Sequence, residues 1–116
     1  EARLIPEDRL VCPISMGNHM DHRLTRAAAE AMDRTLWYYP DYPYVATAPA
    51  SLTAFLQPAW SKECFCISIR GLEAWQRAIA KYSSQVSTFW NGLATMRADI
   101  ELYWRSEGGS CLWRRT

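Results

Sequence analysis

The chain has 116 residues, 49% of them hydrophobic, and a formal net charge of +1. This length and composition predict one folded domain with a hydrophobic core, spanning residues 1–116. The near-neutral charge excludes a strong whole-protein field of the kind that attracts nucleic acid or an anionic membrane, and no apolar run approaches the roughly 20 residues of a membrane span.

Two elements are predicted in the first third of the chain. Residues 9–15 form a short extended segment, and Pro13, which has no N–H to donate, places that segment at a sheet edge or strand end. Residues 21–39 form a helix with Asp21 as its N-cap, and Pro40 ends it. The apolar face of this helix comprises Leu24, Ala28, Ala31 or Met32, and Thr35 or Leu36.

The segment 37–44 reads WYYPDYPY and has two interpretations. Its prolines stiffen the chain and its rings cover the open end of a core, because proline lowers the entropy lost on ordering and aromatic side chains bury large areas. Alternatively, the segment is a stiff recognition loop. Tyr42, flanked by Asp41 and Pro43, is then the ring that points outward.

Four short elements are predicted in the middle and at the end of the chain. Residues 44–48 read as a strand, residues 51–57 as one or two turns of helix, and residues 110–116 as a last strand. Residues 63–71 alternate most regularly and are the clearest strand. In that strand one face, expected to meet the helices, carries Phe65, Ile67 and Ile69, and the other carries Cys64, Cys66 and Ser68.

The segment 72–103 has the strongest periodicity. Its apolar residues recur at alternating spacings of three and four, which predicts one continuous or slightly kinked helix of about 48 Å. Asn91 and Gly92 are the point at which this helix could instead split into a hairpin. The seam consists of Leu72, Trp75, Ile79, Tyr82, Val86, Phe89, Leu93, Met96, Ile100 and Tyr103.

The predicted order is strand, helix, strand, strand, helix, strand, with a short helical insert. This order indicates an α+β fold in which a small antiparallel sheet carries two main helices on one face, in the split β-α-β arrangement, with a long last helix. The alternative is a mainly helical hairpin with irregular connections.

The four cysteines favour two disulfides and an oxidising compartment. Cys64 and Cys66 should not bond each other, because neighbours at i and i+2 on a strand lie about 6.5–7 Å apart. We therefore expect them to bond Cys12 and Cys111, in either order. Free buried thiols and a metal site remain as alternatives, and the close spacing of Cys64 and Cys66 does not fit a usual zinc knuckle.

The segment GNHMDH gathers both histidines of the chain, His19 and His22, with Asp21. Two histidines and an acid can hold a metal or pair a base with its orienting group, and the segment resembles a fragment of larger metal-hydrolase motifs. The other ligands are missing, and Asp21 has a simpler role as a helix cap. We therefore predict no catalytic residue, no metal and no cofactor.

Several aromatic residues and arginines are candidates for binding a partner. Trp90, Arg97 and Trp104 would form a stripe along the long helix, unless they only broaden its buried face. Two arginines follow Trp113 near the end of the sequence, where the alternative is a solvated terminus. The candidate binding residues are Tyr42, Trp90, Arg97, Trp104, Arg114 and Arg115.

Element order and cysteine count together are similar to those of the α/β-sandwich killer toxins and secreted effectors of fungi. The chain opens EARLIPEDRL without methionine, so we expect a processed product. The resemblance implies a secreted, disulfide-stabilised toxin or virulence effector that is not an enzyme. It would bind a host or competitor protein or cell-surface component, and no specific nucleic acid. The alternative is an intracellular helical adaptor or coat protein that binds a partner through the 72–103 seam.

Overall fold

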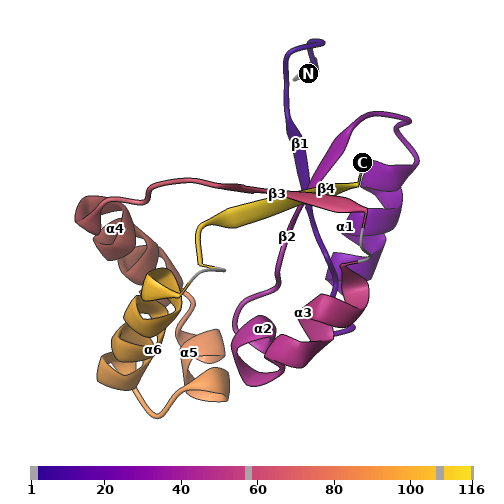
Figure 1. The fold of residues 1–116 in the computed structure, drawn as a ribbon. Helices are drawn as coiled ribbons and strands as arrows, with labels where there is room; N and C mark the ends of the chain where they lie inside the picture. The colour runs from indigo at the N-terminus through magenta and orange to yellow at the C-terminus, as the bar shows by residue number, and fades with distance from the viewer. Residues whose placement is uncertain (1–2, 57–58, 107–108, 116) are drawn as a thin grey trace. The chain divides into compact units, whose positions relative to one another are not determined.

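The computed structural model describes residues 3–56, 59–106 and 109–115, and Figure 1 shows the ribbon. These residues form six helices and a four-stranded sheet, which confirms the predicted α+β class.

The chain divides into two compact units, and the single domain expected from the sequence stays a prediction. The first, called here the N-terminal unit, comprises residues 1–63 and 112–116. The second, called here the helical unit, comprises residues 64–111. The N-terminal unit is therefore built from two separate stretches of sequence.

The sheet is mixed, which corrects the expectation of an antiparallel one. Its strand order is β1-β2-β4-β3; β1 and β2 are parallel, and β2 and β4 are antiparallel. The parallel pair follows from the helix α1 between β1 and β2, because parallel neighbours need a long crossover. β1 lies at the sheet edge, as Pro13 predicts. The strands are β1 (Leu10–Pro13), β2 (Leu36–Tyr39), β3 (Trp60–Cys64) and β4 (Cys111–Arg115).

The first helix, α1 (Met20–Glu30), is shorter than predicted. Its N-cap is His19, not Asp21, and the chain leaves the helix before Asp33, which has a left-handed φ of 48°. The residues 36–39, predicted as helix, are strand β2, in line with the preference of aromatic residues for sheets. The predicted apolar face is also wrong, because Leu24 is 69% exposed.

Two short helices follow β2. The predicted strand at 44–48 is wrong, because residues Tyr44–Thr47 form helix α2. The predicted helical turns beginning at residue 51 are confirmed by α3 (Pro49–Phe55), which has its proline in the first turn, where a missing N–H costs nothing. Residue 57 of that prediction lies outside the described residues.

The core of the N-terminal unit lies between the sheet, α1 and α3. Side chains of β1 and β2 form this core together with Ile14, which follows β1. The ring of Tyr38 in β2 packs on that of Trp60 in β3, with the ring centroids 4.8 Å apart. Ala29 of α1 and Leu52 of α3 pack against it. The buried members are Cys12, Ile14, Leu36 and Tyr38.

The predicted continuous helix at 72–103 is wrong. The segment forms three helices, α4 (Ile69–Ala80), α5 (Ser83–Phe89) and α6 (Leu93–Arg105). The chain turns at Tyr82, and again at Trp90 and Gly92, whose φ is 99°. The second turn is the break considered at Asn91 and Gly92. Among the described residues, no helix combines the length and the apolar character needed to cross a bilayer.

The strand predicted at 63–71 is also misplaced. β3 ends at Cys64, and Ser68 instead caps α4 by accepting a hydrogen bond from the Gly71 N–H at 3.2 Å. Phe65 and Ile69, predicted to meet the helices, are 41% and 63% exposed. The alternation of the segment therefore comes from a loop and a helix start.

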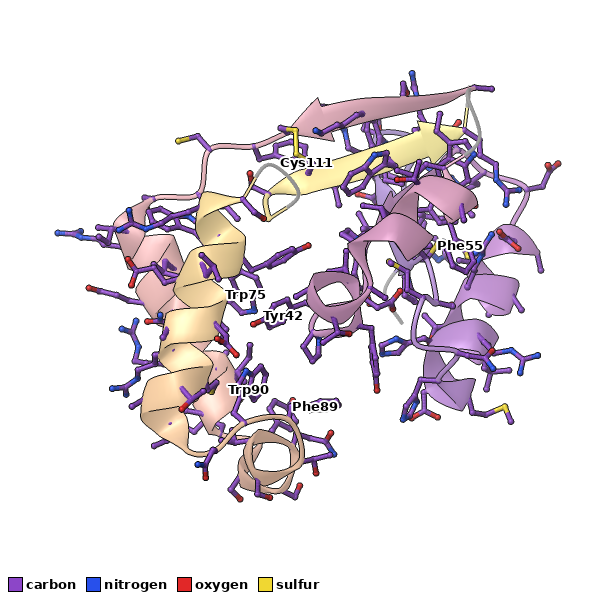
Figure 2. The ribbon with its side chains drawn as sticks, turned by 60° about the horizontal axis from the view of Figure 1, so that its bottom comes forward. Tyr42, Phe55, Trp75, Phe89, Trp90 and Cys111 are labelled. Atoms are coloured by element: carbon purple, nitrogen blue, oxygen red, sulfur yellow. A yellow bond between two sulfur atoms is a disulfide. The ribbon has the colours of Figure 1, made fainter. Side chains whose placement is uncertain are left out.

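One of the two predicted disulfides is present. Cys64 and Cys111 are bonded, and Figure 2 shows this bond in yellow beside the label of Cys111. The second predicted bond is wrong, because Cys12 and Cys66 are free. Cys12 faces the core of the N-terminal unit, whereas Cys66 lies past the end of β3 and is exposed.

The two free thiols should react at very different rates. Burial raises the pKa of the Cys12 thiol to about 11, so at pH 8 it has little thiolate and little access to reagent. We expect one fast thiol, Cys66, when the folded protein is titrated with a disulfide reagent, and a second only after unfolding. Cys66→Ser should remove the fast phase. Two fast thiols, or none, would contradict this assignment.

Candidate functional site

The aromatic segment 37–44 surrounds a buried carboxylate. Asp41 is 1% exposed, and burying a charge is costly unless it is paired. One oxygen, Oδ2, accepts a hydrogen bond from the Met16 N–H at 2.9 Å. The other, Oδ1, lies 2.6 Å from Nδ1 of His22, which is an ion-pair distance, although the two atoms do not meet in hydrogen-bond geometry. The segment therefore holds an acid in place for a histidine that comes from another element.

A tight turn at residues 15–18 precedes α1 and sets the position of the two histidines at the helix start. Ser15 and Asn18 have left-handed φ values of 69° and 53°, and the Asn18 N–H donates to the Ser15 carbonyl at 3.2 Å. Gly17 lies directly against the ring of Tyr44, where a Cβ would clash. This turn is tied to the 37–44 segment from both sides, so it sets where α1 begins.

His19 and His22 lie at the start of α1, as N-cap and in its first turn. Their ring centroids are 5.5 Å apart. The side chain of His22 is 34% exposed, so its ring joins the buried acid to the surface. Since Nδ1 of His22 faces Asp41, its Nε2 is the nitrogen left to bind a metal or a proton.

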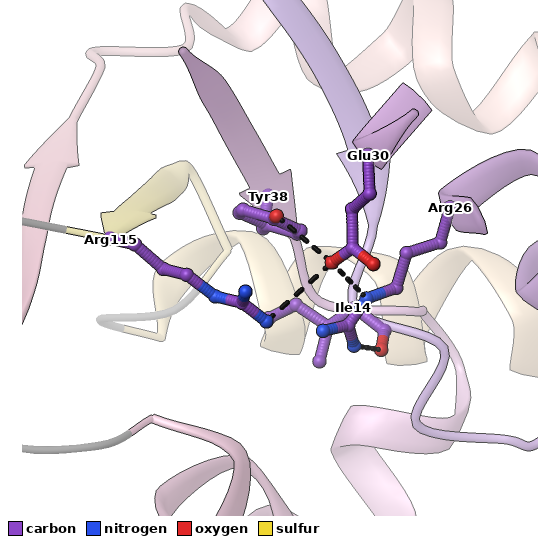
Figure 3. Close-up of polar contacts among 5 residues, drawn as sticks. All are labelled: Ile14, Arg26, Glu30, Tyr38 and Arg115. Carbon is purple, nitrogen blue, oxygen red and sulfur yellow. Dashed lines mark hydrogen bonds and ion pairs between the residues drawn. The ribbon is translucent and has the colours of Figure 1, made fainter. Parts of the chain in front are cut away.

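A second cluster of charges centres on Glu30 at the end of α1 (Figure 3). Its carboxylate accepts hydrogen bonds from Arg26 Nε at 3.0 Å and the Tyr38 hydroxyl at 3.1 Å, and Arg115 lies 3.5 Å away. Burial alone would raise the pKa of Glu30, but the hydrogen bonds from Arg26 and Tyr38 and the charges of Arg26 and Arg115 outweigh it. The pKa is therefore lowered.

Arg114 and Arg115 belong to β4 and are not a solvated tail, which corrects one alternative for them. The Arg114 guanidinium carbon lies 5.2 Å from the ring centroid of Trp37, and that of Arg115 lies 5.2 Å from Trp60. Stacking of guanidinium on these rings is a favourable cation–π contact. Both arginines are thus engaged within the N-terminal unit.

The predicted stripe on the helical unit is not formed. Trp90 ends α5, is buried, and donates from Nε1 to Asp99 at 3.1 Å. Trp104 is half-buried and donates from Nε1 to the Ile67 carbonyl at 3.0 Å. Arg97 is exposed on α6. The two tryptophans therefore contribute to packing, as expected if they only broaden the buried helix face. Tyr42, the remaining candidate, lies in the N-terminal unit and is half-buried.

Comparison of the chain with protein-family models, curated proteins and solved structures gives no match. Sequence analysis found His19 and His22 but missed Asp41, whose only local signal is an acid set among rings and prolines. In the described residues, no group of three or more His, Cys, Asp or Glu side chains has a metal-binding arrangement.

Proposed function

We propose that the N-terminal unit carries part of a metal-dependent hydrolase centre, in which Nε2 of His22 binds Zn²⁺ and Asp41 orients the ring. The observation that carries the proposal is the 2.6 Å contact between His22 Nδ1 and Asp41 Oδ1. Metal-bound histidines almost always donate their other ring N–H to a carboxylate, a carbonyl or water. The prediction that the histidines are not catalytic remains untested, and this geometry supports the opposite.

Two observations favour a metal over a metal-free base. The ring centroids of His19 and His22 are 5.5 Å apart, and two imidazoles on one tetrahedral zinc, with Zn–N distances of about 2.0–2.1 Å, have centroids about 5 Å apart. In addition, within the described ranges no Ser, Thr or Cys side chain hydrogen-bonds to either ring, as a nucleophile in a triad would.

The two histidines supply only part of such a centre. A catalytic zinc takes three protein ligands and one water. The described residues offer two, so water and substrate would fill the remaining positions. A bound zinc would lower the pKa of its water to about 7, which suits attack on an ester or amide carbonyl. Asp41 would hold the His22 ring so that its Nε2 is aimed at the metal.

Zinc titration of the metal-free full chain by calorimetry tests the proposal. We expect saturable binding that His22→Gln abolishes and Asp41→Asn weakens 10–100-fold, as loss of an orienting partner does. Asp33→Asn is the matched control, since Asp33 is exposed in the turn after α1, and it should bind as the parent does. The zinc-loaded parent should hydrolyse p-nitrophenyl acetate faster than the metal-free chain.

Zinc binding that His22→Gln leaves intact would place the metal elsewhere and defeat the proposal. Absence of zinc binding would do the same. Zinc binding without any gain in ester hydrolysis would retain the metal site and remove the hydrolase function.

A second candidate is the secreted, disulfide-stabilised toxin or effector that acts by binding a target. The Cys64–Cys111 bond supports it, because such bonds persist mainly in oxidising compartments. The adaptor alternative has less support, since four residues of the 72–103 seam are buried: Leu72, Val86, Met96 and Ile100.

A further inference from the structure

A cavity of about 480 Å³ opens in the N-terminal unit between the loop before α1, the helix itself and α3. Its volume lies within the range of small-molecule sites. Ile14, Met16 and Phe55 supply apolar walls, and Figure 2 places Phe55 on α3. Residues 15–23 contribute both to this cavity and to the site of His22, but the polar side chains that line the cavity are different from the His22–Asp41 pair.

Two cationic side chains of α1 line this cavity, and they differ in how they are engaged. Arg26 donates from Nε to Glu30 at 3.0 Å and from a terminal nitrogen to the Ile14 carbonyl at 2.7 Å. Within the described residues, the guanidinium of Arg23 has no hydrogen bond or ion pair. Arg23 is therefore the cation that is left to meet a ligand.

The cavity wall also contains an unpaired hydroxyl. Oγ of Ser15 is buried and has no hydrogen-bond partner among the described residues. A buried polar atom without a partner costs about 1–3 kcal/mol, so a ligand acceptor at this point would be favoured. The one carboxylate in the wall, Glu30, is already bonded to Arg26 and Tyr38 and lies near Arg115. Arg23, the Ser15 hydroxyl and the Asn18 carboxamide, which also line the cavity, can each donate to an anionic group.

We propose that this cavity binds a small organic carboxylate, whose apolar body lies against Phe55 and whose anionic group is bound by Arg23 and Ser15. A guanidinium and a hydroxyl are both donors to carboxylate oxygens, and an arginine can hold a carboxylate by two parallel hydrogen bonds. The apolar walls favour an organic anion over inorganic phosphate. This inference goes beyond the proposed hydrolase function and does not depend on a metal.

Binding of hexanoate to the full chain in metal-free buffer tests the inference by NMR titration. We expect shifts in the amides of residues 14–27 and a hexanoate affinity at least tenfold above that of the neutral hexanamide and of inorganic phosphate. Arg23→Gln should weaken hexanoate at least tenfold and leave hexanamide unchanged. Ser15→Gly, which tolerates the left-handed φ, should weaken hexanoate by about threefold or more.

Arg77→Gln is the control, because Arg77 is an exposed arginine of α4 outside the cavity, and this variant should bind hexanoate as the parent does. Equal binding of hexanoate and hexanamide would overturn the proposal, and so would unchanged binding by Arg23→Gln. Phosphate that binds as tightly as hexanoate would replace it with a simple anion site. Since no zinc is present, these outcomes are independent of the hydrolase test.

Discussion

Asp41→Ala should lower the free energy of unfolding of the N-terminal unit by about 3 kcal/mol. The substitution leaves the Met16 N–H without its acceptor and Nδ1 of His22 without its carboxylate. Both losses fall on the turn that positions the start of α1. Urea unfolding of the full chain, read by circular dichroism, measures the change, and hydrogen exchange of peptides from each unit assigns it to one of them.

The matched control for this variant is Asp21→Ala. The Asp21 side chain is 84% exposed in the first turn of the same helix, so its removal should cost less than about 1 kcal/mol through the helix dipole. Asp41→Asn should fall between the two, because the amide oxygen can still accept from Met16. A loss below about 1 kcal/mol for Asp41→Ala would show that the buried pair contributes little to the fold.

Replacing Cys64 and Cys111 together by serine should destabilise the helical unit by about 4 kcal/mol. The bond closes a loop with a sequence separation of 47, and the chain-entropy model assigns about that value to a loop of this length. The effect arises mainly because the unfolded chain regains freedom, so unfolding should shift while the helical content of the folded unit stays the same. Urea unfolding under non-reducing conditions gives the magnitude.

Cys66→Ser is the control for this pair. It removes a thiol of the same type two positions from Cys64, but one that is exposed and free, so its stability change should stay within about 0.5 kcal/mol. If the double variant and Cys66→Ser were equally stable, the Cys64–Cys111 bond would have no stabilising role.

Elements with local signals were predictable. Three elements have turn residues or proline at their ends: the edge strand with Pro13, the helix after residue 48 and the last strand. All three are present in the structure. The helix predicted at 21–39 is too long, because the apolar spacing continues past Glu30, where α1 ends. The left-handed turn at Asp33 has no strong sequence signal, and the strand at 36–39 forms because β1 pairs with it.

Longer-range features were not predictable in the same way. The 72–103 seam keeps its spacing through two turns of the chain, because each of three short helices has its own apolar face. Periodicity alone does not distinguish this arrangement from one helix. In the candidate site, His22 belongs to a recognisable His-x-x-His segment. Its partner Asp41 is distant in sequence and is brought close only by the crossover from α1 to β2.

The place of β4 in the sheet has a consequence for synthesis on the ribosome. β4 lies between β2 and β3, although it is translated after every other described element. Until it emerges, β2 has one open edge and β3 has no neighbour on either side, and exposed edges invite pairing with other chains. At about 5–20 residues per second, the wait from Cys64 to Arg115 lasts about 3–10 s. During that interval the helices of the helical unit can form, whereas the charged residues Lys62 and Glu63 of β3 are what discourages pairing of its open edges with other chains.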